Sequence, residues 1–191
     1  MALMTDIEST TASPLRACTV VAVAEPGAEG TKRSRPLAGP QIGVFVPSSG
    51  GVRQRFGDRW SNFGFGWGAV RAPKQGGAWS ADLSFLSNRR TRDGDQGNAL
   101  LVPFGGEYRI ALGEPAGVWR PYGGGTVGGV AAWLDDPLSG RAVRGRIAPS
   151  AGLFAGVAFG ARAYVEVHGY AFGRTGDWSA GGWNFAAGVR F

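Results

Sequence analysis

The chain has 191 residues, among them 34 glycines and one cysteine, and it carries 20 basic against 14 acidic side chains. A single cysteine excludes an internal disulfide framework and a metal site built from several cysteines, and 43% hydrophobic residues are too many for a disordered chain. No apolar run approaches the roughly 18 residues of a membrane-spanning helix. Membrane-spanning β-strands alternate apolar with polar or small residues, so they produce no such run and are not excluded.

Residues 1–39 differ in character from the rest of the chain. They hold Ser/Thr-rich and Pro/Gly-rich stretches without sustained periodicity. The short apolar run from Ala17 to Ala24 follows Arg16 and resembles a degenerate secretory signal. The alternatives to a secretory signal are a flexible leader or a start codon assigned in the wrong place. We therefore expect residues 1–39 to be a flexible leader, with the lone Cys18 inert.

From Pro40 onward, apolar and small or polar residues alternate with the period of two that is typical of strands. The alternating segments are 41–46, 62–69, 79–85, 100–110, 118–133, 146–159, 163–171 and 182–191. An even number of strands allows closure without a free edge. The connections 47–59, 88–97, 134–145 and 173–179 are long or polar, whereas those near 72–77, 111–117 and 159–162 are shorter. Residues 40–191 are thus predicted to form an all-β, eight-stranded antiparallel up-and-down transmembrane β-barrel.

The polar face of these strands indicates which side points inward. It consists mostly of Gly, Ser, Ala and Asn, which suit the narrow lumen of an eight-stranded barrel. Isolated charges of both signs interrupt it, and buried charges require partners. We predict a self-neutralising lumen network that includes the only histidine: Asp82, Glu107, Arg109, Arg120, Glu166, His168 and Arg190.

Most of the tryptophans fall near predicted strand ends. Indole rings favour the boundary between lipid and water, where membrane barrels carry aromatic girdles. The residues assigned to these girdles are Trp60, Trp79, Trp119, Trp133 and Trp178.

With these features, residues 40–191 resemble the small outer-membrane β-barrel proteins of Gram-negative bacteria. The C-terminal segment from Trp183 to Phe191 looks like the terminal targeting strand of that family, with alternating apolar residues and an aromatic as the last residue. Ala186 stands where the motif tends to have Gly. The resemblance implies localisation in the outer membrane and recognition by the barrel-assembly machinery, through Trp183, Phe185, Val189 and Phe191.

The sequence offers little catalytic chemistry. His168 and Glu166 share one strand face, but no second His or Cys completes a metal site and no nucleophile stands in a G-x-S-x-G context. The glycine runs lack the Lys-Ser/Thr of a phosphate-binding loop. We expect no catalytic residue, no metal and no cofactor.

The net charge of +6 is scattered along the chain, so we do not expect nucleic acid as a partner. The four longer connections together hold nine arginines and six aspartates. Arginine forks at the outer end could bind lipopolysaccharide phosphates, and an ordinary solvated loop surface is the alternative.

The predicted function is therefore that of an integral outer-membrane barrel with a structural or surface-interaction role and a lumen filled by side chains. Three alternatives stay open: a soluble lipocalin-like barrel that binds a small apolar ligand, a lipid-modifying outer-membrane enzyme, and a narrow pore.

Overall fold

The computed structural model describes residues 38–68, 77–92, 95–112, 118–136, 141–160, 162–174 and 179–191. They form β1 (Ala38–Pro47), α1 (Gly50–Phe56), β2 (Trp60–Gly68), β3 (Gly77–Arg92), β4 (Asp95–Ala111), β5 (Trp119–Asp136), β6 (Arg141–Phe159), β7 (Ala163–Phe172) and β8 (Gly182–Val189). Residues 1–37 lie outside the described residues, and β1 begins two residues before the expected start of the barrel.

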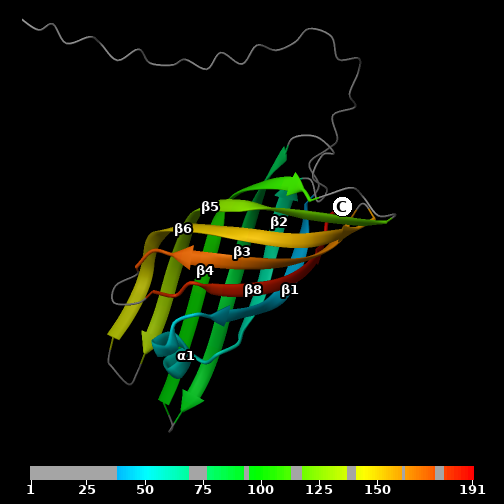
Figure 1. Cartoon of the computed structure of the whole chain (residues 1–191). Coiled ribbons are helices and arrows are strands. Elements are labelled where there is room, and N and C mark those ends of the chain that lie inside the picture. The colour runs from blue at the N-terminus through cyan, green and yellow to red at the C-terminus, as the bar shows by residue number, and fades with distance from the viewer. Residues whose placement is uncertain are drawn as a thin grey trace, which may run out of the picture. The chain divides into compact units, whose positions relative to one another are not determined.

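The strands pair in chain order, each antiparallel to the next, and β1 pairs with β8 to close the barrel. The closing pair sets Val44 opposite Phe185 and Ile42 opposite Ala187. The predicted eight-stranded antiparallel barrel is therefore confirmed (Figure 1). We call the end that carries α1 the α1 end, and the opposite end, where β1 begins, the short-turn end.

The wall of the barrel is uneven in height. Strands β3 to β6 have 16 to 19 residues, whereas β1, β2, β7 and β8 have 8 to 10. The longer strands continue past their neighbours toward the α1 end (Figure 1). The prediction of long loops over 88–97 and 134–145 was therefore wrong, because most of these residues extend the strands. Polar and charged residues interrupt the apolar positions of these extensions, so the alternation that marks a strand is weak there.

Helix α1 lies within the segment 47–59, which was expected to be a connection between strands. Its two apolar residues, Val52 and Phe56, stand four positions apart and are therefore on one face, and both are fully buried. The helix has no acidic residue in its first turn and no side-chain cap at its N-terminus. Burial of these two side chains therefore holds this short helix in place more than helix propensity does.

The outside of the barrel is apolar. Outward side chains such as Ile42 (65% exposed) and Leu153 (75% exposed) face the surroundings, whereas Glu107 and Arg109 on the other face are buried. This confirms the predicted orientation of the two strand faces. A lipocalin-like soluble barrel requires the reverse, so that alternative is contradicted. Among the described residues, no helix is long and apolar enough to cross a membrane.

Several inward glycines make room for tyrosine rings on neighbouring strands. Tyr122 lies directly opposite Gly156, and Tyr164 directly opposite Gly188. A Cβ on Gly156 would lie 2.8 Å from Cζ of Tyr122, and one on Gly188 would lie 2.6 Å from Cζ of Tyr164. The high glycine content thus allows large side chains to lie flat across a narrow lumen.

Candidate functional site

The lumen holds a layer of buried ionisable groups centred on Arg109. Its Nη2 donates to Glu107 Oε2 at 2.6 Å, and its Nη1 lies 2.8 Å from Glu166 Oε2. Nε donates to the hydroxyl of Ser80 at 2.9 Å. The guanidinium also lies over the Tyr122 ring, 5.0 Å from its centroid. One cation thus bridges two carboxylates that come from different strands.

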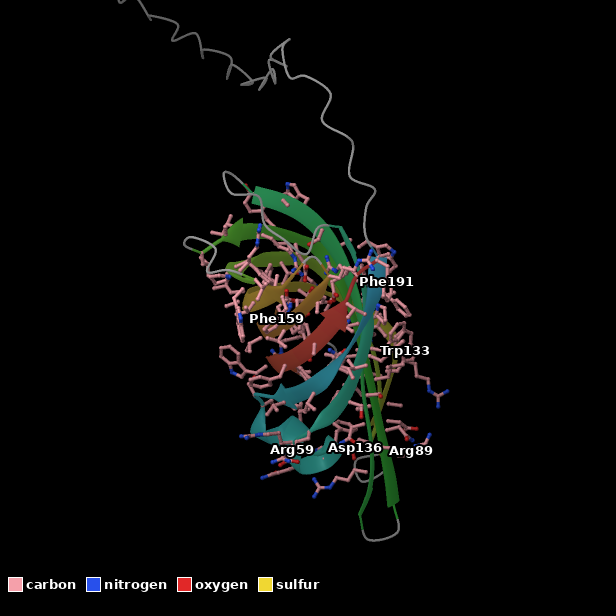
Figure 2. The ribbon with its side chains drawn as sticks, turned by 90° about the vertical axis from the view of Figure 1, so that its right-hand side faces the viewer. Arg59, Arg89, Trp133, Asp136, Phe159 and Phe191 are labelled. Carbon is pink, nitrogen blue, oxygen red and sulfur yellow. The ribbon has the colours of Figure 1, made fainter. Side chains whose placement is uncertain are left out.

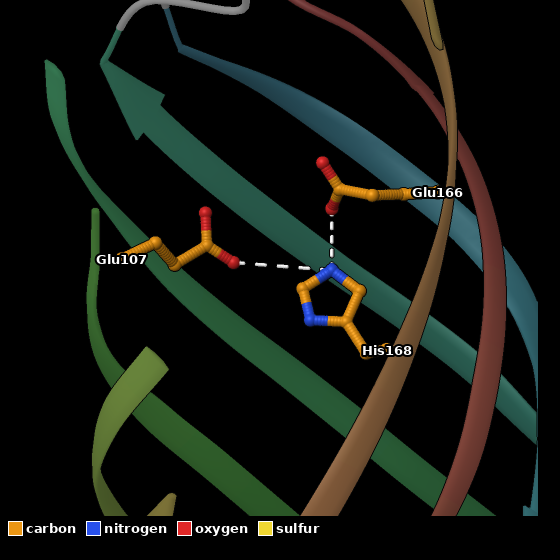
Figure 3. A group of neighbouring side chains, drawn as sticks. All are labelled: Glu107, Glu166 and His168. Atoms are coloured by element: carbon orange, nitrogen blue, oxygen red, sulfur yellow. Dashed lines mark hydrogen bonds and ion pairs between the residues drawn. The ribbon is translucent and has the colours of Figure 1, made fainter. Parts of the chain in front are cut away.

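His168 lies beside the same two carboxylates and faces both of them (Figure 3). Its Nε2 donates to Glu166 Oε1 and lies 4.0 Å from Glu107 Oε1. The imidazole is stacked between Phe154 and Tyr170, with centroid distances of 5.0 Å and 5.3 Å. Both ring faces are therefore covered, which fixes the orientation of the imidazole.

The three groups Glu107, Glu166 and His168 place potential ligand atoms within 4.8 Å of one another. A divalent cation would have to enter beside Arg109, whose guanidinium already contacts both carboxylates. Two like charges at such short range repel strongly in a buried site. The donor set therefore does not fit a metal ion while Arg109 is in place.

The remaining carboxylate of the layer, Asp82, is held by neutral donors. Gln41 Nε2 donates to Asp82 Oδ1 at 2.7 Å, and the Ser84 hydroxyl donates to Oδ2 at 3.0 Å. Gln41 in turn accepts from the Tyr164 hydroxyl at 2.9 Å. Neutral hydrogen-bond donors thus satisfy both carboxylate oxygens of this residue.

The two other predicted arginines lie toward the short-turn end. Arg190 is fully buried, donates to the carbonyl oxygen of Gly68 at 3.2 Å, and lies over the Tyr164 ring. Arg120 is half-buried near the start of β5. Neither forms an ion pair with the acidic groups within the described part of the chain. Of the predicted lumen network, Arg109 and His168 therefore contact Glu107 and Glu166, whereas Arg120 and Arg190 do not neutralise its acidic members.

Between this charged layer and α1, the lumen is filled by apolar side chains. The buried cluster contains Phe45, Val52, Phe56, Trp60, Leu86, Ala99, Leu101, Val130, Ala132, Leu134, Val143, Ala148, Tyr170, Phe172 and Ala180. Its aromatic rings pack against one another: the centroid of the Phe45 ring lies 5.7 Å from that of Trp60 and 6.2 Å from that of Phe172. This apolar layer was not predicted, because large residues such as Phe45 stood among glycines on a face expected to be small and polar.

The girdle assignment of Trp60 was wrong, because this side chain points inward and is 1% exposed. Its indole Nε1 donates to the carbonyl oxygen of Gly57 at 3.0 Å, which satisfies the buried donor. Trp79 and Trp119 point outward near the short-turn end, and Trp133 points outward near the α1 end. Trp178 lies outside the described residues.

The residues of the proposed targeting strand all point outward. Trp183, Phe185 and Val189 occupy alternate positions of β8, and Phe191 follows as the last residue, 66% exposed. The targeting role itself stays a prediction.

The α1 end carries a cationic surface. A surface pocket of about 700 Å³ next to α1 is lined by Arg53, Arg89 and Arg90 and by one acidic residue, Asp58. Figure 2 shows Arg59 and Arg89 at this end of the molecule and Phe159 and Phe191 at the other. The charges that were assigned to the outer loops therefore lie on the extended strands and on α1 as well.

No family model and no curated protein sequence matches this chain. Among solved structures, Neisserial surface protein A (NspA) superposes with a TM-score of 0.63 at 13% identity, covering 82% of this chain and 96% of that chain. The attachment invasion locus protein Ail of Yersinia pestis, in complex with the heparin analogue sucrose octasulfate, gives a TM-score of 0.45 at 16% identity, covering 83% and 100%. The chain thus has the fold of the small eight-stranded outer-membrane barrels.

Proposed function

We propose that this protein is an integral outer-membrane barrel with a structural or surface-interaction role and without enzymatic activity. The observation that carries the proposal is the inverted distribution of side chains: apolar residues face outward around a closed barrel, and the ionisable residues face inward. Such an outer surface is favourable in lipid, because the apolar side chains then avoid water, and closure of the barrel pairs the first strand with the last.

A filled lumen supports a role other than conduction. Arg109 and Glu107 are buried in the lumen, and the apolar layer with Phe56 and Trp60 follows toward α1. A pore requires water-filled space along the axis, which these two layers occupy. Catalysis on lipid is also disfavoured, because His168 and Glu166 face the lumen and not the lipid.

The test is membrane fractionation combined with heat-dependent gel mobility. We expect the folded protein in the outer-membrane fraction, with a band that migrates differently before and after boiling, as stable barrels resist detergent until heated. The chain without Phe191 is expected to show less of the folded band, because the targeting strand then loses its terminal aromatic. A folded product recovered only in the soluble fraction, with no heat-dependent band, would contradict the proposal.

A second candidate function, binding of lipopolysaccharide phosphates, is favoured by the arginines that line the pocket next to α1. Arginine recognises phosphate through paired hydrogen bonds, and Arg53 and Arg89 are exposed at this surface. Replacing both by Gln is expected to lower binding of purified lipopolysaccharide to the protein in phospholipid nanodiscs. The matched control replaces Arg162, exposed at the short-turn end, and should leave binding unchanged.

A further inference from the structure

Arg190 is a buried cation whose hydrogen bonds are incomplete. Its side chain is fully buried, and its Nη1 donates to the carbonyl oxygen of Gly68, the last residue of β2, at 3.2 Å. The other two guanidinium nitrogens, Nε and Nη2, have no hydrogen-bond partner among the described residues. A buried charge without partners is costly, so buried cations in proteins are normally paired. Two donors of this guanidinium are therefore available to a further ligand.

The guanidinium of Arg109 shows the usual arrangement in the same lumen. Its Nη2 and Nη1 lie 2.6 Å and 2.8 Å from carboxylate oxygens of Glu107 and Glu166. Its Nε donates to the hydroxyl of Ser80 at 2.9 Å. Each nitrogen of this arginine thus faces an oxygen atom, whereas Arg190 has only the one bond. The two buried arginines therefore differ in what the protein itself supplies to them.

Within the described part of the chain, no acidic side chain completes the bonds of Arg190. Asp82 lies opposite Gly66 in the β2–β3 register and faces the same lumen. Gln41 and Ser84 already donate to its two carboxylate oxygens. The described residues therefore leave the free donors of Arg190 to a solute.

The two free donors stand side by side on one edge of the guanidinium. The N–H bonds of Nε and Nη2 point in parallel there, which is the arrangement through which arginine binds two oxygens of a carboxylate or a phosphate. Gly66 keeps this edge clear, because a Cβ on it would lie 2.3 Å from Nη2 and 3.0 Å from Nε. The ring of Tyr164 lies beside the guanidinium, with its centroid 5.2 Å from Cζ. The edge is thus held in place and free of side chains.

We propose that Arg190 binds a small oxyanion, a carboxylate or a phosphate, through Nε and Nη2 at the short-turn end of the lumen. Because Gly68 ends β2, an anion reaches this site from the short-turn end without crossing the apolar layer. The exposed Arg162, whose carbonyl oxygen accepts from the backbone N–H of Arg190, and the half-buried Arg120 at the start of β5 belong to the same end. Their charges raise the local concentration of anions.

The test is a proton–nitrogen NMR titration of the protein folded in micelles of dodecyl maltoside, a detergent without phosphate. The Nε–H resonance of Arg190, assigned by its loss in Arg190→Lys, should move saturably with sodium formate and with inorganic phosphate. The Nε–H of Arg109 already donates to Ser80, so it is the internal control and should not move. Sodium chloride at equal ionic strength supplies a single-atom anion that cannot bridge both donors, and its apparent affinity should be about ten-fold lower.

A glycine variant tests the geometry of the site. Gly66→Ala places a Cβ against the free edge and should weaken formate binding by about ten-fold. Gly125→Ala is the matched control, because the nearest contacts of its Cβ would be 3.6 Å and 3.8 Å away, and it should bind formate as the unaltered protein does. Heat-dependent gel mobility verifies that each variant is folded. If Gly66→Ala does not fold, the rise in the urea unfolding midpoint that formate gives the unaltered protein should be absent from Arg190→Lys.

Three results would overturn the proposal: an Arg190 resonance that neither oxyanion moves, an equal response to chloride, or an equal response of Arg109. The first would assign the free edge to water, and the other two would mean a general effect of salt. A resonance that is already shifted in phosphatidylglycerol nanodiscs, before any anion is added, would support the site and identify lipid phosphate as the source of the oxyanion. Because the titration needs only the folded barrel, its failure is distinguishable from failure of outer-membrane localisation.

Discussion

The two layers of the lumen are stabilised in different ways. In the apolar layer, residues such as Leu86 and Leu101 make many weak contacts that depend mainly on volume. In the charged layer, Arg109 has particular partners, Glu107 and Glu166, at hydrogen-bonding distance. When a side chain in the apolar layer is replaced by one of another shape, many neighbours can each adjust slightly. Loss of one partner in the charged layer instead leaves a buried charge unpaired. The charged layer should therefore be the less tolerant of substitution.

The two layers are joined by a stack of side chains on β7. His168, Tyr170 and Phe172 stand at every second position, and their rings follow one another at 5.3 Å and 5.2 Å. His168 belongs to the charged layer, and Phe172 to the apolar one. Substitutions in either layer are therefore expected to affect the cooperativity of unfolding as well as the local packing.

The largest expected effect comes from Arg109→Met. This change leaves Glu107 and Glu166 buried without their shared cation, which should lower the free energy of unfolding by about 3–5 kcal/mol. The measurement is guanidinium-induced unfolding from lipid vesicles.

The matched control for that variant is the triple substitution Arg109→Met with Glu107→Gln and Glu166→Gln. Replacing all three charges removes the unpaired carboxylates, so the triple variant should be more stable than Arg109→Met alone. If the single variant were the more stable of the two, the charged layer would not depend on its ion pairs, and the contrast between the layers would fail.

A smaller effect is expected from Leu86→Ala in the apolar layer. Leu86 is fully buried, and truncating it creates a cavity that should lower the free energy of unfolding by about 3 kcal/mol. The control is Leu153→Ala on the outer wall, where the side chain is 75% exposed and lipid fills the vacated volume. Equal losses in both variants, measured in the same vesicles, would mean that the lumen is no better packed than the lipid-facing surface.

Alternation was sufficient to predict the barrel and the direction of its side chains, because period two is set by strand geometry alone. It placed Glu107, Arg109 and His168 correctly in the lumen. It could not assign their partners, since contacts between β4 and β7 depend on how strands separated in sequence curve across the barrel. Asp82 and Arg190 show this limit, because both are buried on the same side of the wall and yet do not pair with each other.

The apolar layer and α1 were not predicted for a different reason. Burial of Trp60 depends on α1, which folds back over the end of the lumen and buries Phe56 beside it, with ring centroids 6.4 Å apart. Nothing in the local alternation distinguishes a tryptophan that faces lipid at a strand end from one that a distant helix covers. Likewise, β3 to β6 extend through segments in which polar and charged residues interrupt the alternation, so periodicity gives little signal there.

The smallest effect concerns a glycine that borders the charged layer. A Cβ on Gly156 would lie 2.8 Å from Tyr122 Cζ and 2.6 Å from the carbonyl oxygen of Val165. Gly156→Ala should therefore displace the Tyr122 ring and weaken the hydrogen bond that its hydroxyl donates to Glu166, at a cost of about 2 kcal/mol. Gly125→Ala is the matched control, because its nearest contacts would be 3.6 Å and 3.8 Å away. If the two alanine variants unfold at the same guanidinium concentration, the tyrosine does not support the charged layer, and the ion pairs of Arg109 alone define it.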